Sequence, residues 1–185
     1  FLEFAVKKAG APQRWLPPDK EFKRTLIGSS TRSSAEALTV PLKEQDLEML
    51  LDGLASNEKH GLRLCVGLVG LFGLRPSELG ELTVDDGKLY VGQTKRNMQT
   101  LHKPKAPPRR VIAIDLPSLP NEGQRLIAQY DSGIVKFPLA ITRAIQRAKE
   151  KDEYKEIGDA LRQLLQRYWL WQAMEKRTEG LKVYS

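Results

Sequence analysis

A single arginine stands at the end of the most apolar segment of the chain, within the stretch GLRPSELGEL at 73–82. The segment before it, LRLCVGLVGLF at 62–72, is almost entirely hydrophobic and predicts a buried helix. Arg75 precedes Pro76, so its backbone is expected to be extended, and the proline suits the start of a second, short helix. A guanidinium at such a rigid junction can grip an oxyanion through its planar fork. The structural alternative is an arginine bonded to backbone carbonyls at the helix end.

A second concentration of reactive and charged groups is the segment KRNMQTLHKPKAPPRR at 95–110. Six of its sixteen residues are basic and none is acidic, so it carries +6 of the net charge of +7. Such a segment is either a solvated hairpin tip or a ribbon laid along a phosphate backbone, where lysine and arginine make sequence-independent contacts. Its cations are Lys95, Arg96, Lys103, Lys105, Arg109 and Arg110.

The elements that must position these two stretches follow from hydrophobic spacing and turn residues. Pro41 suits the first turn of a helix that Ser56 and Asn57 would end, with leucines at helical spacing between them. Further helices are predicted at 59–72, 121–130, 138–150 and 153–178, and strands at 82–84, 88–93 and 110–115. The last two strands are expected to pair as an antiparallel ribbon closed by the basic loop. The fold class is therefore mixed α/β (α+β), mainly helical with a small three-stranded antiparallel sheet.

Composition narrows the class of protein further. The chain has 185 residues, 41% of them hydrophobic, which suits one sizeable domain or one domain with part of a second. The basic charge favours a polyanionic partner, nucleic acid or an anionic membrane surface. No apolar run is long enough to cross a bilayer and no signal-peptide pattern opens the chain, so a cytoplasmic location is expected. One cysteine and two distant histidines do not form a metal site.

One cysteine and three aromatic residues are predicted to have structural roles. Cys65 lies in the apolar run and is expected to be a small core side chain. Tyr168, Trp169 and Trp171 lie on the last predicted helix and are expected to be core residues.

Taken together, these features resemble the first half of the catalytic domain of the tyrosine recombinases, the phage-integrase family. The first signature box of that family, Gly-Leu-Arg-x-x-Glu-Leu, is matched by Gly73, Leu74, Arg75, Glu78 and Leu79. In the family, the catalytic lysine lies where the second strand of a ribbon enters its turn, and LYVGQTK at 89–95 is similar to that strand. The resemblance covers 38–185, whereas 1–37 resembles the end of the core-binding domain and its linker.

The resemblance implies a reaction in which a tyrosine attacks a DNA phosphodiester and forms a 3′-phosphotyrosyl link. Arg75 would stabilise the negative charge on the non-bridging oxygens. Lys95 would protonate the departing 5′ oxygen. Arg96 and Lys103 are the alternative residues for this role if the strand aligns differently with that of the family. Glu78 would support the site rather than take part in the chemistry. The DNA-binding residues would be Arg96, Lys103, Lys105, Arg109 and Arg110, and neither a cofactor nor a metal ion is expected.

The second half of the family's site has no counterpart at a matching position. The family continues with a His-x-x-Arg box, a His or Trp, and then the tyrosine nucleophile, whereas LKVYS at 181–185 resembles the stretch that runs directly into that box. None of the five tyrosines follows such a box: Tyr90, Tyr130, Tyr154, Tyr168 and Tyr184. The sequence is therefore expected to be the N-terminal part of a recombinase catalytic domain, unable by itself to form the covalent link.

The expected setting is bacterial or phage-type DNA recombination or integration on the nucleoid. The partners implied are double-stranded DNA and further copies of the chain on that DNA, with no membrane and no small-molecule cofactor. Two other classes stay open. One is a non-catalytic DNA-binding module of the same fold, and the other is a basic helical interaction domain without a role on DNA.

Overall fold

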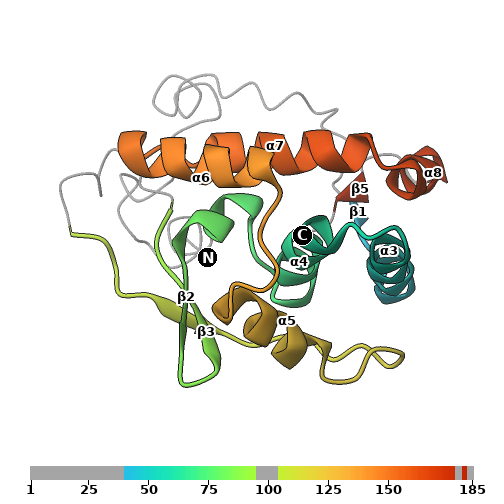
Figure 1. Ribbon diagram of the computed structural model, residues 1–185, viewed down its shortest axis with the longest axis horizontal. Coiled ribbons are helices and arrows are strands. Elements are labelled where there is room, and N and C mark those ends of the chain that lie inside the picture. The colour runs from blue at the N-terminus through green and yellow to red at the C-terminus, as the bar shows by residue number, and fades with distance from the viewer. Residues whose placement is uncertain (1–39, 95–103, 178–180, 183–185) are drawn as a thin grey trace, which may run out of the picture. The chain divides into compact units, whose positions relative to one another are not determined.

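The computed structural model describes residues 40–94, 104–177 and 181–182 (Figure 1). The chain divides into two units, Phe1–Ala37 and Leu38–Ser185, and every described residue belongs to the second. The assignment of 1–37 to a core-binding domain and linker therefore lies outside the described residues and stays a prediction.

The described part is mainly helical, with a small three-stranded antiparallel sheet, which confirms the α+β class. Its helices are α3 (Glu44–Ser56), α4 (His60–Leu71), the 3-10 helix η2 (Pro76–Glu81), α5 (Glu122–Asp131), α6 (Leu139–Lys151), α7 (Lys155–Gln166) and α8 (Trp169–Arg177). The three-stranded sheet consists of β2 (Leu82–Asp85), β3 (Lys88–Val91) and β4 (Arg109–Val111), and two short strands, β1 (Val40–Pro41) and β5 (Leu181–Lys182), pair in parallel.

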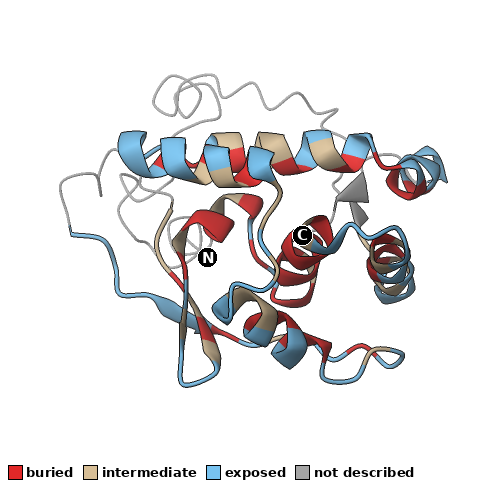
Figure 2. Ribbon diagram, viewed as in Figure 1, coloured by how far each residue is buried: buried red, intermediate tan, exposed pale blue. Residues whose placement is uncertain are grey.

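Helix α4 is the centre of the core, as its apolar sequence predicted. Nine of its twelve residues are buried, Cys65 among them, and it packs against α3, α5 and η2 (Figure 2). Gly67 is what lets α5 come this close, because a Cβ there would lie 2.5 Å from Cδ1 of Leu126. The burial of α4 fixes its C-terminal end, from which the chain enters the stretch that carries Arg75.

One ion pair is buried at the junction of α3, α4 and α5. Nη2 of Arg63 lies 2.6 Å from Oε1 of Glu122, and the two residues are 5% and 3% exposed. The Nε–H of Arg63 donates to the carbonyl of Leu51 in α3, and the other carboxylate oxygen pairs with Arg125. Since a buried charge without a partner is costly, this network holds α5 in one position against α4.

The sheet forms through a tight hairpin and one long connection. Strands β2 and β3 pair antiparallel around Asp86 and Gly87, both with positive φ, as a two-residue type I′ turn requires. Strand β4 pairs with β3 on the other side, so the order is β2-β3-β4. Strands β3 and β4 are shorter than the strands predicted at 88–93 and 110–115. After Val111 the chain leaves the sheet, and the N–H of Ile114 donates instead to the carbonyl of Leu71 at the end of α4.

Three further sequence predictions were wrong. Pro41 lies in strand β1 rather than in the first turn of a helix. The helix predicted over 153–178 is two helices, because Tyr168 turns inward between them. Its side chain and that of Leu170, in the first turn of α8, approach α3 at Gly53, which has no side chain to block them. Tyr168 and Trp171 are core residues as predicted, whereas Trp169 is 61% exposed.

Candidate phosphate-binding and DNA-contacting site

The Gly-Leu-Arg stretch is a helix-termination motif with a projecting cation. Gly73 has φ of +59° and ends α4 in the left-handed conformation, and the N–H of Leu74 donates to the carbonyl of Val69 at 3.0 Å. This is the Schellman pattern, and Leu74 is fully buried as its apolar anchor. Arg75 follows in the extended conformation, with φ of −75° and ψ of 141°, and is exposed. The backbone on both sides of Arg75 is therefore held by hydrogen bonds and packing.

Glu78 fastens this junction to the start of η2. Its N–H donates to the carbonyl of Arg75 at 2.8 Å, and its Oε2 accepts the N–H of Arg75 at 2.8 Å. Pro76 occupies the first turn, where its missing N–H costs nothing. Within 40–94 and 104–177, the guanidinium of Arg75 has no hydrogen-bonding partner. The carbonyl-bonded arrangement considered from the sequence is thus not the one found among those residues.

The same carboxylate holds a cation of the basic segment. Nη2 of Arg109, at the start of β4, lies 3.0 Å from Oε1 and 3.2 Å from Oε2 of Glu78. Glu78 is only 9% exposed, whereas the Arg109 side chain is 56% exposed. The structure thus brings the backbone of Arg75, the carboxylate of Glu78 and the guanidinium of Arg109 together, although the sequence separates the first and last by 34 positions.

Lys105 has different surroundings, a cluster of side chains from η2 and the α6–α7 connection. Its Nζ lies 3.1 Å from Oδ1 of Asp152 and 3.6 Å from Oε1 of Glu81, and it donates to the hydroxyl of Tyr154 at 3.4 Å. It also lies 5.4 Å from the centre of the Tyr154 ring, within the range of a cation–π contact. The hydrogen bond to Asp152 is the main cause that raises the pKa of the Lys105 ammonium. This lysine is therefore charged and already paired within the fold.

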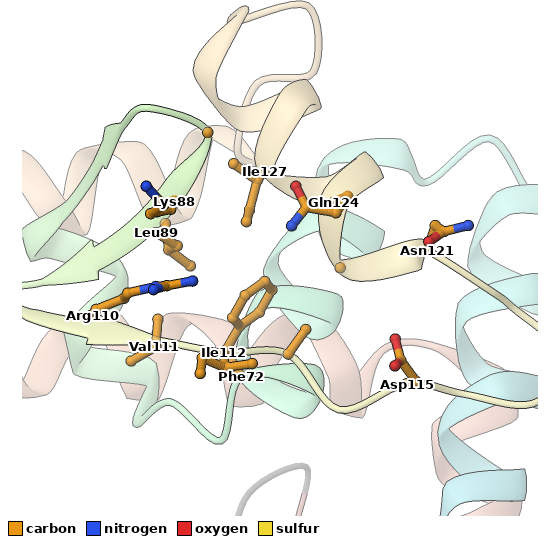
Figure 3. A pocket seen from close by; sticks show the side chains of 13 residues that line it. Phe72, Lys88, Leu89, Arg110, Val111, Ile112, Asp115, Asn121, Gln124 and Ile127 are labelled. Carbon is orange, nitrogen blue, oxygen red and sulfur yellow. The ribbon is translucent and has the colours of Figure 1, made fainter.

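Arg110 follows Arg109 on β4 but belongs to the other face of the sheet. It pairs in register with Tyr90, whereas Arg109 pairs with the buried Val91. Arg110 lines a hollow of about 180 Å³ between the sheet and α5, with Phe72 and Ile127 among its apolar walls. Figure 3 shows Arg110 and Gln124 pointing into this hollow from opposite sides.

The remaining cations of the basic segment, Lys95, Arg96 and Lys103, lie outside the described residues. Their roles stay predictions. The structure does place the two arms of the ribbon, which are the residues that follow β3 and those that precede β4. The first arm leaves β3 at Val91, and the second is held beside η2 through Lys105. On the returning arm, the N–H of Ala106 donates to Oε1 of Gln93 at 2.9 Å and so joins the two arms.

Sequence reasoning missed Glu81, Asp152 and Tyr154 as partners of the basic segment. Glu81 lies three residues after Glu78 within the opening motif, and this repeat of carboxylates on η2 was a usable signal. Asp152 and Tyr154 are far from Lys105 in sequence, and no spacing connects them. Their contact depends on how α6 and α7 pack against η2.

Three of the described tyrosines have hydroxyl groups that are hydrogen-bonded within the fold. The Tyr154 hydroxyl donates to Glu81, that of Tyr130 donates to the carbonyl of Leu82, and that of Tyr168 accepts from the amide of Asn57. Burial is the first cause that raises the pKa of all three phenols, so the neutral form is favoured. Tyr90 pairs within the sheet, and Tyr184 lies outside the described residues. A neutral phenol whose hydroxyl is already hydrogen-bonded within the fold, as in Tyr130, Tyr154 and Tyr168, is a poor nucleophile.

Comparison of the chain with protein-family models, curated proteins and solved structures finds no match. Across the described residues, no helix is both long and apolar enough to span a membrane. In the same residues, no three histidine, cysteine or acidic side chains gather as a metal site would require.

Proposed function

We propose that this chain is the DNA-binding part of a site-specific tyrosine recombinase or integrase, a protein that breaks and rejoins DNA through a 3′-phosphotyrosyl intermediate. The observation that carries the proposal is the placement of Arg75. It is an exposed guanidinium on a backbone fixed by the Schellman turn before it and by Glu78 after it. Preorganised positive charge is the main means of stabilising a phosphoryl-transfer transition state.

The three-stranded sheet supports the same proposal. It follows η2 directly, and β3 and β4 are the two arms of the segment that carries most of the net charge. In this proposal Arg75 contacts the scissile phosphate, Lys95 supplies the proton to the leaving oxygen, and the other cations of the segment contact neighbouring phosphates. Glu78 positions its arginine neighbours. The chain would bind double-stranded DNA together with further copies of itself.

We further propose that residues 1–185 by themselves form no covalent DNA adduct. Arg75 and Lys95 can stabilise charge and donate a proton, but neither can become the phosphotyrosyl link. The engagement of Tyr130, Tyr154 and Tyr168 within the fold supports this. The alternative, a non-catalytic DNA-binding module, shares the DNA contacts and differs only in having no reaction.

Duplex binding is tested by fluorescence anisotropy with a labelled duplex over a range of salt concentrations. If about four phosphates are neutralised, the logarithm of the association constant should fall against the logarithm of the salt concentration with a slope near −4, whatever the DNA sequence. Replacement of Lys103, Lys105, Arg109 and Arg110 by serine should flatten that slope. The matched control replaces four exposed cations of α6 and α7 instead: Arg143, Lys149, Lys155 and Arg162. Equal effects of the two sets would show that the basic segment has no special role.

Covalent chemistry is tested with a nicked suicide substrate analysed on a denaturing gel. We expect no shifted band with this chain, and a band with a chain that continues past Ser185 through a second box and its tyrosine. A band with residues 1–185 would refute the proposal that this chain lacks the nucleophile and would direct the search to its five tyrosines. No band with either protein would favour the non-catalytic module.

A further inference from the structure

The strongest unassigned feature is the carboxylate of Glu78, which holds the backbone of Arg75 and the side chain of Arg109. Oε2 of Glu78 accepts the backbone N–H of Arg75 at 2.8 Å and a proton of Arg109 Nη2 at 3.2 Å. The backbone nitrogen of Arg75 and Nη2 of Arg109 therefore lie no more than 6.0 Å apart, so the two side chains start from neighbouring positions. Both arginines are exposed, and the carboxylate between them is nearly buried.

The pairing uses only one edge of the Arg109 guanidinium. Both contacts to Glu78 come from Nη2, so Nε and Nη1 have no partner within the described residues. A guanidinium can hold a carboxylate with one edge and present another edge to a second oxyanion. Two arginines and one glutamate leave a local charge of +1, which matches a phosphodiester.

Arg109 differs in this respect from the other described cations of the basic segment. Lys105 is surrounded by Asp152, Glu81 and Tyr154, and a compact ammonium pairs with them as a point charge. Arg110 lines the hollow on the side of α5. Of these three cations, only Arg109 pairs with Glu78, whose carboxylate also accepts the backbone N–H of Arg75.

We propose that Arg75 and Arg109 bind one and the same phosphate, with Glu78 as the positioning residue that orients the Arg109 fork. This deepens and rests on the proposed function, because the phosphate would be the one at which the strand is cut. Arg109 would then be a member of the phosphate site rather than one of several interchangeable backbone contacts. Its guanidinium would reach the site already oriented, which lowers the entropy lost on binding.

The first experiment tests the site without DNA. The ¹⁵N-labelled chain is titrated with inorganic phosphate against chloride at equal ionic strength, and the arginine Nε–H signals are followed by NMR. We expect the Arg75 and Arg109 signals to shift along one common binding curve, while the Arg110 signal stays in place. Arg110 is the matched control, since it is the adjacent residue on the same strand. Separate curves, or an equal shift of Arg110, would overturn the inference.

The second experiment is a double-variant cycle on duplex binding. Arg75→Ala and Arg109→Ala should each weaken binding about tenfold, as loss of one charge-assisted contact does. If they share a phosphate, the double variant should bind at least about fivefold more tightly than the product of the single effects predicts. Arg75→Ala with Arg110→Ala should be additive. Additivity in both cycles would overturn the shared site even if the chain binds DNA well.

A conservative variant guards against effects of misfolding. Arg109→Lys keeps the charge but not the fork, so the Arg75 Nε–H signal should need at least about fivefold more phosphate for the same shift, while the salt slope of DNA binding is kept. An Arg75 curve unchanged in this variant would contradict the role given to the fork. If wild-type protein gives the common curve with phosphate but does not bind duplex DNA, the two-arginine site stands and the proposed function fails.

Discussion

Removal of one partner from the buried pair of Arg63 and Glu122 should strongly destabilise the fold. Glu122→Leu leaves the Arg63 guanidinium buried, with the carbonyl of Leu51 as its remaining described partner. Breaking a buried pair in this way costs about 3–5 kcal/mol of the free energy of unfolding. Arg63→Met should cost less, about 3 kcal/mol, because Glu122 keeps its contact with the partly exposed Arg125.

The double variant decides whether this reasoning is right. With both charges gone and apolar side chains in their place, the free energy of unfolding should return to within about 1 kcal/mol of wild type, because neither desolvation penalty is then paid. Urea denaturation followed by tryptophan fluorescence measures the free energy of unfolding of the two single variants and of the double variant. At a slope of about 2 kcal/mol per molar urea, Glu122→Leu should lower the midpoint by about 2 M with the slope unchanged. A double variant whose loss equals the sum of the single losses would refute the account of the network.

Three further predictions concern the site itself. Asp152→Asn removes a partner of Lys105 and keeps a residue that tolerates the φ of 53° found there, so duplex binding at low salt should tighten, by no more than about fivefold. The control is Asp86→Asn, which removes the partner of Lys88 at a similar left-handed position and should have less effect on binding. Gly73→Ala should lower the free energy of unfolding by about 1 kcal/mol through its positive φ alone, because no atom lies near the added Cβ, and Gly73→Asn should cost less in the same urea assay. In a protein that carries the second box, Lys95→Ala should slow cleavage, and a substrate with a 5′-bridging sulfur should restore the rate, because a thiolate leaves without a proton; no rescue would remove Lys95 from the role of acid and make Arg96 and Lys103 the next candidates.

The sequence by itself determined the local structure around the candidate site. The apolar run at 62–72 required a buried helix, Gly73 marked its end, and Pro76 both extended Arg75 and opened η2. The strands predicted at 82–84 and 88–93 were likewise local features, and β2 and β3 begin at the predicted residues, although β3 ends two residues early. These predictions held because helix ends and tight turns are decided by a few neighbouring residues.

Only the tertiary structure decided which charges meet. Arg109 pairs with Glu78 and Lys105 with Asp152, and both pairs join segments that are distant in the sequence. Tertiary contacts also overrode local preference, since the inward turn of Tyr168 against α3 broke a segment whose spacing predicted one long helix. Arg63, which reads in the sequence as an interruption of an apolar helix, became the buried partner of Glu122. Charge pairing depends on the relative placement of whole elements, and that placement follows from how their apolar faces pack, which no local pattern of residues specifies.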